Sequence, residues 1–187
     1  RAGGSRVVSI GYLALVREDA PHGAVDAEWA NCYDFLPWED WRNGRPALLD
    51  QVICPALAKW ADAVPEERQQ RTDRVSITFA TDDAPWDVER VLDRYELLYE
   101  TGLVREAVRD RGPVGERSGE DDIGRSFALD HRRILATALG RLRGKLKYRP
   151  VVFELLAPTF TLLNLQNVVE ALIALANSRD KVLIGLG

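Results

Sequence analysis

The sequence contains no methionine, only two cysteines and two histidines, and no run of 18 apolar residues. Without such a run we expect no membrane-spanning helix, and without a charged and then apolar leader we expect no signal peptide. Cys32 and Cys54 form no Cys-x-x-Cys or Cys/His pattern, so we interpret both as buried free thiols of a cytoplasmic protein. The lack of methionine predicts either a fragment without its original N-terminus or a sequence from which methionine positions are missing.

The overall composition is that of a globular protein with a hydrophobic core. Of the 187 residues, 46% are hydrophobic and 29% are charged, which excludes a disordered chain, a collagen and a disulfide scaffold. The formal net charge is −4 at pH 7. A chain of this charge has no general attraction for nucleic acid or anionic lipid, so binding of either requires a local basic patch.

Two segments have the pattern of β-strands. Residues 6–16 (RVVSIGYLALV) are apolar on both alternating faces, which predicts a central strand covered on both sides. Residues 75–80 (VSITFA) are short, rich in β-branched side chains and bounded by charged turns, which predicts a second strand. Between them, residues 29–41 (WANCYDFLPWEDW) combine a proline with crowded rings, which predicts a packed loop.

Helical periodicity is found first in the middle of the chain. Residues 46–64 predict a helix that is split or kinked at Pro55. From Asp87 onward, apolar residues recur at spacings of three and four, which predicts a helix that stops at Gly102. Residues 110–125 are rich in glycine and charge, so we interpret them as a solvated loop and as the best internal break.

Two more helices are expected after this break. Residues 129–146 have an amphipathic pattern, and Pro150 ends any continuation. Thr161 is a suitable N-cap for a following helix. The stripe of that helix expected to be buried is formed by Leu165, Val168, Val169 and Leu172.

The segment from Tyr95 to Leu103 (YELLYETGL) resembles the end of the Nudix box, where a glutamate-rich helix holds magnesium against a diphosphate. Glu96 and Glu100 match two acidic positions of that box, but Tyr95 and Tyr99 stand where it has an arginine and a ligand. We therefore interpret the segment as an amphipathic helix. We expect no catalytic residue, no metal and no cofactor.

Residues 132–149 form a basic segment, with seven arginines and lysines and no acidic residue. Such a segment suits the phosphates of a nucleotide or of a nucleic-acid backbone, although a solvated helix face that pairs with the acidic remainder explains it equally well. Asp130 and His131 precede or begin this helix, where capping and packing explain them better than catalysis. The sequence has neither a glycine-rich phosphate loop nor a Gly-x-Ser-x-Gly motif.

Two stretches resemble one family of regulators. RVVSIGYLALV near the start, and DHRRILATALGRLRGKLKYRPVVFELLAPTFTLLNLQ from Asp130 to Gln166, are similar to the Nudix-related transcriptional regulators of NAD metabolism, the NrtR-type repressors and their NadQ-like relatives. FLPWEDWRNGRPALLD and WDVERVLDRYELLYETGLVREA are similar to an insert of the NadQ-like branch. The box of that family precedes the RVVSIGYLALV strand, so YELLYETGL is not that box. Residues 177–187 do not match the family's recognition helix.

The resemblance implies an α+β fold class, with a partial Nudix-like α/β/α domain followed by the start of a winged helix-turn-helix. The ligand-binding domain would comprise residues 1–149, with inserted helices at about 46–110. The beginning of the DNA-binding domain would comprise residues 150–187. Both domains would be incomplete.

The implied function is a cytoplasmic, non-enzymatic, homodimeric repressor of NAD metabolism genes. An adenine nucleotide such as ATP, NAD or ADP-ribose would favour a dimer geometry that no longer fits operator DNA. We expect the ligand to face Arg6, Tyr12 and His131. We expect DNA or nucleotide phosphates to contact Arg143, Lys145, Lys147 and Arg149. The alternatives are a Nudix hydrolase of ADP-ribose-like substrates and a plain dimerisation or scaffold module.

Overall fold

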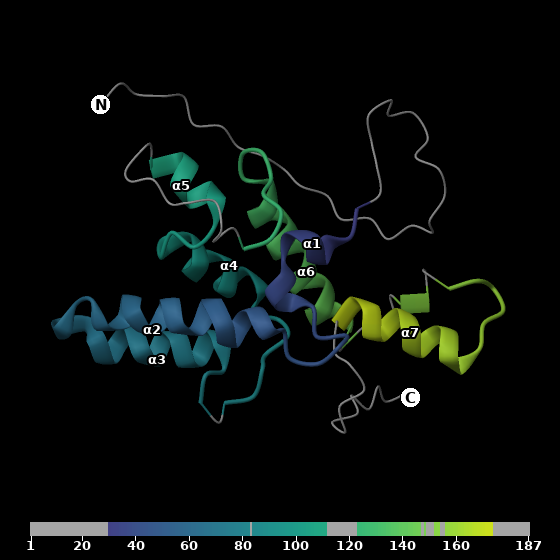
Figure 1. Cartoon of the computed structure of the whole chain (residues 1–187). Coiled ribbons are helices and arrows are strands. Elements are labelled where there is room, and N and C mark those ends of the chain that lie inside the picture. The colour runs from purple at the N-terminus through teal and green to yellow at the C-terminus, as the bar shows by residue number, and fades with distance from the viewer. Residues whose placement is uncertain are drawn as a thin grey trace.

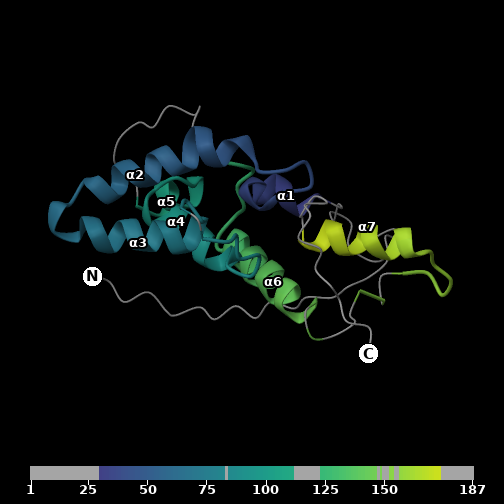
Figure 2. The same ribbon diagram turned by 90° about the horizontal axis from the view of Figure 1, so that it is seen from below.

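A computed structural model of the chain describes residues 30–82, 84–111, 123–146, 148, 152–153 and 156–173. These residues form an assembly of helices (Figure 1). Helices α2 (Cys54–Asp62) and α3 (Arg68–Phe79) lie side by side and project at one end of the molecule. Helix α7 (Leu162–Ile173) lies at the opposite end, and α6 (His131–Leu146) lies between them in both views (Figures 1 and 2).

The expected fold class is wrong. The described residues contain ten helical segments and no β-strand, which does not fit an α/β/α Nudix-like domain. The first expected strand, residues 6–16, lies outside the described residues. The second expected strand, residues 75–80, is described: residues 75–79 belong to α3, and Ala80 is the residue that follows the helix.

The reason for this second error is visible in α3. Val75, Thr78 and Phe79 are all buried, and their spacing of three and one places them on one face of a helix rather than on alternating faces of a strand. Helix α3 begins at Arg68, so residues 75–79 are its last turns. Considered alone, these residues favour a strand, but their place in the longer helix determines their conformation. Ala80 ends α3 in the left-handed conformation, with φ of 49°.

The expected helix at residues 46–64 forms and runs without a break over residues 47–62, with a π-helical turn before Pro55 instead of a split. A π-helical turn, η2 (Leu49–Ile53), precedes α2, and the backbone N–H of Cys54 donates to the carbonyl oxygen of Leu49. Proline has no N–H and its ring clashes with the carbonyl four residues earlier, so widening the preceding turn relieves that clash. A short 3-10 turn, η3 (Pro65–Glu67), then leads into α3.

The aromatic segment is not the packed loop that the sequence predicts. It forms two short helical elements, α1 (Cys32–Phe35) and the 3-10 turn η1 (Pro37–Glu39). The side chain of Asn31 accepts a hydrogen bond from the N–H of Tyr33 and so caps α1. Pro37 occupies the first turn of η1, where its missing N–H costs no hydrogen bond. Trp38 and Leu36 are completely buried in the core.

Helix α4 (Val91–Glu100) confirms the periodicity read from the sequence, although it begins four residues later than expected. Gly102 ends it as expected, with φ of 74° and with hydrogen bonds from Gly102 N–H to Tyr99 and from Leu103 N–H to Leu98. The following helix, α5 (Arg105–Arg111), was not predicted. Its short length leaves too few periodic positions to reveal it.

Helices α6 and α7 are confirmed. The hydroxyl of Thr161 accepts from the N–H of Asn164 at 3.1 Å, which is the N-cap that the sequence predicts for α7. The expected stripe of α7 is only half-buried, and Leu162 and Leu163 at its start are 80% and 63% exposed. Helix α7 is therefore covered less than a core helix.

Candidate functional site

The expected phosphate-contacting residues of α6 fall into different environments. Lys145 is exposed and free to reach a phosphate. Arg143 is only 1% exposed, and its guanidinium donates to groups within the protein. Lys147 and Arg149 lie outside the described residues. Phosphate binding by the exposed lysine stays a prediction, whereas the environment of Arg143 is that of a structural residue.

Among the residues expected to face a ligand, only His131 is described. It is exposed at the first position of α6, and its ring makes a T-shaped contact with that of Phe127, with 6.3 Å between the ring centroids. Arg6 and Tyr12 lie outside the described residues. A ligand-binding role for these three residues stays a prediction.

The most connected polar site is a buried cluster around Glu39, which we call the Glu39 junction and which consists of Glu39, Arg94 and Arg143. Arg143 approaches from α6: its Nη1 lies 2.5 Å from Glu39 Oε2, and its Nη2 donates to the Glu39 carbonyl oxygen at 3.2 Å. The same Nη1 donates to the carbonyl oxygen of Val88 at 3.1 Å. Arg143 thus joins α6, η1 and the segment that leads into α4.

Arg94 holds the other side of the same carboxylate from α4. Its Nε lies 2.5 Å from Glu39 Oε1, and its remaining donors reach the carbonyl oxygens of Thr78 and Asp87 at 3.3 and 2.9 Å. The guanidinium also lies over the ring of Trp86, 3.9 Å from its centroid. Every ionised group of the junction is therefore both buried and hydrogen-bonded, which is the condition under which buried charges are tolerated.

The Glu39 junction extends to α7. The Nε of Arg143 donates to the carbonyl oxygen of Leu172 at 3.2 Å, and the hydroxyl of Tyr33 donates to that of Ala171 at 2.6 Å. Burial raises the pKa of Tyr33 to about 12. The last carbonyl groups of a helix lack intrahelical partners and carry partial negative charge, so a cation and a hydroxyl stabilise them. These two contacts attach the C-terminal end of α7 to the rest of the protein.

A second buried pair joins α6 to α5. Arg132 Nη1 lies 3.1 Å from Glu106 Oε2, while Arg132 Nε donates to the Phe35 carbonyl oxygen at 2.7 Å. The other oxygen of Glu106 accepts from the N–H of Phe127 at 2.9 Å. Two members of the basic segment, Arg132 and Arg143, are thus interior residues. Sequence reasoning could not separate them from the exposed members, because their acidic partners lie 26 and 104 positions away.

Sequence reasoning missed Glu39 and Tyr33. Both belong to the aromatic segment interpreted as a loop, and Glu39 is 1% exposed although glutamate is almost never fully buried without a partner. The only available signal was a glutamate directly after Trp38 in a segment rich in aromatic side chains. That signal does not identify which arginines meet the carboxylate.

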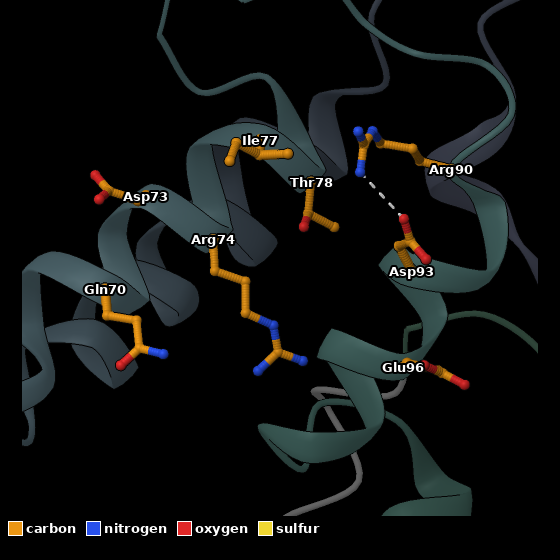
Figure 3. A pocket seen from close by; sticks show the side chains of 8 residues that line it. All are labelled: Gln70, Asp73, Arg74, Ile77, Thr78, Arg90, Asp93 and Glu96. Carbon is orange, nitrogen blue, oxygen red and sulfur yellow. Dashed lines mark hydrogen bonds and ion pairs between the residues drawn. The ribbon is translucent and has the colours of Figure 1, made fainter.

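A separate groove of about 390 Å³ lies between α3 and α4 (Figure 3). Glu96 and Glu100, which match two acidic positions of the Nudix box, are both engaged in ion pairs near it: Glu96 with Arg133, and Glu100 with Arg74 at 2.6 Å. Within the described ranges no group of three or more His, Cys, Asp or Glu side chains is placed to hold a metal ion. Helix α4 is amphipathic, as the sequence predicts, with Val91, Tyr95 and Leu98 among its buried residues.

Both cysteines are free thiols, as expected, but they are partly rather than fully buried. Burial raises the pKa of each thiol, which lowers its thiolate fraction at neutral pH.

No protein-family model and no curated protein matches the chain. Of the helices described, none is long and apolar enough to cross a membrane.

Proposed function

We propose that this chain belongs to a cytoplasmic, homodimeric transcriptional repressor of NAD metabolism genes that responds to an NAD-related adenine nucleotide. The sequence support is the similarity of residues 130–166 to NrtR-type repressors. Residues 150–187 would belong to the DNA-binding part. The helices before them would receive the nucleotide signal.

The observation that carries this proposal is the attachment of α7 through the Glu39 junction. A regulator needs a physical link between the part that senses a ligand and the part that binds DNA. One guanidinium, that of Arg143, donates to Glu39, to the Val88 carbonyl oxygen and to the C-terminal end of α7. A movement of η1 or of the segment before α4 would therefore also change the contact between Arg143 and α7. Tyr33 adds a second contact to the same end of α7.

The proposed mechanism is a shift between two positions of α7. In one position Tyr33 and Arg143 hold its C-terminal end, and in the other these hydrogen bonds are broken and α7 changes its orientation. A nucleotide that binds one position more tightly changes the population, and the spacing of two DNA-binding parts in a dimer changes with it. Exposed basic residues of α6, such as Lys145, would then contribute phosphate contacts.

The test uses the full-length gene product. Duplexes that it binds are selected from a random-sequence pool, and the Kd of the best duplex is measured by fluorescence anisotropy at constant salt with ATP, NAD, ADP-ribose or GTP as the control. We expect one adenine nucleotide to weaken DNA binding about tenfold, which lies within the usual range of allosteric coupling. A protein that enriches no duplex, or whose DNA affinity is the same with every nucleotide, contradicts the proposal.

A matched pair of variants tests the link itself. Tyr33→Phe removes the hydroxyl that holds α7, and we expect the nucleotide to bind but to change DNA affinity less than about threefold. Tyr148→Phe is the control, because Tyr148 is 84% exposed. Equal nucleotide effects in both variants would assign the link to another part of the protein.

A further inference from the structure

A short turn directly before α6, residues 128–131, has a strained backbone, and we call it the Leu129 turn. Its ends are joined by a hydrogen bond from the N–H of His131 to the carbonyl oxygen of Ala128 at 3.3 Å. Leu129, the second residue of the turn, has φ of 52°. Turns with positive φ at this position are dominated by glycine, asparagine and aspartate, because a left-handed backbone brings Cβ close to the following carbonyl oxygen.

The side chain of Leu129 does not explain this backbone conformation. Leu129 is 72% exposed, so it gains little from burial. Ala80, the other described non-glycine residue with positive φ, ends α3, where a left-handed residue is common. Leu129 instead precedes a helix, where the chain ordinarily enters with an extended backbone.

The sequence around the turn favours a helix. The amphipathic pattern of α6 extends back to residue 129, two residues before the helix begins in the structure. Alanine and leucine at positions 128 and 129 are among the strongest helix formers, and Ser126 has a side chain suited to an N-cap. In a helical backbone Leu129 would lie three residues before Arg132 and seven before Ala136, on the buried face of α6. A helix that begins after Ser126 would be about one turn longer than the observed one.

Contacts from α5 hold the turn in its strained form. Arg109 donates from Nη1 to the carbonyl oxygen of Phe127 at 3.1 Å and from Nη2 to that of Leu129 at 2.8 Å. Glu106, on the same face of α5, accepts from the N–H of Phe127 at 2.9 Å. The ring of Phe127 stacks on that of Phe35, with 3.9 Å between the centroids. In a longer α6 both carbonyl groups would point along the helix axis to N–H groups four residues later, so they would no longer accept from Arg109.

We propose that the Leu129 turn is a conformational device with two states. In the observed state Arg109 holds the turn in the left-handed conformation and α6 begins at His131; in the other state Arg109 is released and α6 begins about one turn earlier. Relief of the left-handed backbone and burial of Leu129 favour the longer helix, whereas the contacts from α5 favour the observed state. The inference does not rest on the proposed function, but the change occurs in the helix that holds α7 through Arg143.

NMR spectroscopy of the chain distinguishes the two states. The amide and α protons of a residue with positive φ lie close together, so Leu129 should give a strong NOE between them in wild type. In Arg109→Gln this NOE should be lost, and NOEs from α protons to amide protons three residues later, which mark a helix, should appear within residues 127–131. Arg111→Gln is the control, because Arg111 is also exposed on α5 and donates to other carbonyl oxygens, those of Tyr99 and Glu100.

A matched pair of glycine substitutions tests the strain without changing Arg109. Leu129→Gly should raise the midpoint of urea unfolding by about 0.3–0.5 M, because glycine adopts positive φ without a steric cost. Leu163→Gly is the control: Leu163 is also exposed, at 63%, but it lies in α7, where glycine should lower the midpoint.

The proposal is supported if Leu129→Gly raises the midpoint and α6 lengthens in Arg109→Gln but not in Arg111→Gln. It is overturned if Leu129→Gly lowers the midpoint as Leu163→Gly does, because the turn is then not strained. It is also overturned if Arg109→Gln keeps the strong NOE of Leu129, since the turn then does not need Arg109. Loss of that NOE without helical NOEs overturns it as well, because the released turn is then irregular.

Discussion

Replacing Gly140 by alanine is expected to destabilise the protein, although alanine is the better helix former. A Cβ at position 140 would lie 2.8 Å from the backbone carbonyl oxygen of Glu89, so the segment before α4 would have to move. At position 144 the nearest atom is Oε2 of the Glu89 side chain at 3.0 Å, and a side chain can rotate away. The same substitution therefore meets a rigid neighbour at one site and an adjustable one at the other.

The expected magnitudes follow from two opposing terms. Alanine instead of glycine inside a helix contributes about 1 kcal/mol, whereas overpacking against a rigid neighbour costs about 1–3 kcal/mol. Gly140→Ala should then lower the free energy of unfolding by up to about 2 kcal/mol, and Gly144→Ala should raise it by about 0.5–1 kcal/mol. For a protein of this size, 1 kcal/mol corresponds to about 2–4 °C in Tm.

Urea unfolding followed by circular dichroism measures both variants in the same buffer. The midpoint should fall for Gly140→Ala and rise for Gly144→Ala, with unchanged m values. If both variants change stability in the same direction and by the same amount, the close approach of α6 to Glu89 is not what requires glycine at position 140.

Two further predictions concern the Glu39 junction and the contact of Tyr33 with α7. Glu39→Gln leaves two buried guanidinium groups without their carboxylate and should lower the free energy of unfolding by about 3 kcal/mol. The double variant Glu39→Gln with Arg143→Gln should lose less stability than the sum of the two single variants. Strictly additive losses would contradict an energetic coupling between Glu39 and Arg143. Tyr33 has its pKa raised to about 12, so the folded state keeps a proton that the unfolded state loses above pH 10. The free energy of unfolding should therefore fall between about pH 10 and 12 by up to about 1.4 kcal/mol per pH unit. Tyr33→Phe lacks this titrating group, so thermal melting of wild type and variant over this pH range should show a smaller fall for the variant.

The sequence predicted helices well where the apolar period is long and a terminal signal is present. Gly102 ends α4, Thr161 caps α7, and Pro55 follows a π-helical turn, because each of these signals acts on the backbone locally. Residues 75–80 were mispredicted because six residues are too few to distinguish a buried strand from the last turns of a helix. The prediction of an α/β/α architecture, which needs such strands, was wrong as well.

The candidate site was harder to predict, because its chemistry depends on pairs that are distant in sequence. Arg143 and Lys145 look equivalent in a basic helix, yet one is buried against Glu39 and the other is exposed. The helical period places Arg143 on the same face as Leu139 and Leu146, both of which are buried. This position on the apolar face of the helix can be read from the sequence, and it distinguishes Arg143 from the exposed basic residues.

The energetics of α7 fit a switch better than a fixed core element. No α7 side chain whose burial is described is fully buried, and its C-terminal end is held by one hydrogen bond from a charged donor and one from a neutral donor. Two such bonds contribute about 2–4 kcal/mol together. A ligand present at a hundred times its Kd shifts an equilibrium by about 2.7 kcal/mol, which is comparable. If α7 has the two positions proposed above, a nucleotide that binds only one of them would supply a free energy comparable to that of these two hydrogen bonds.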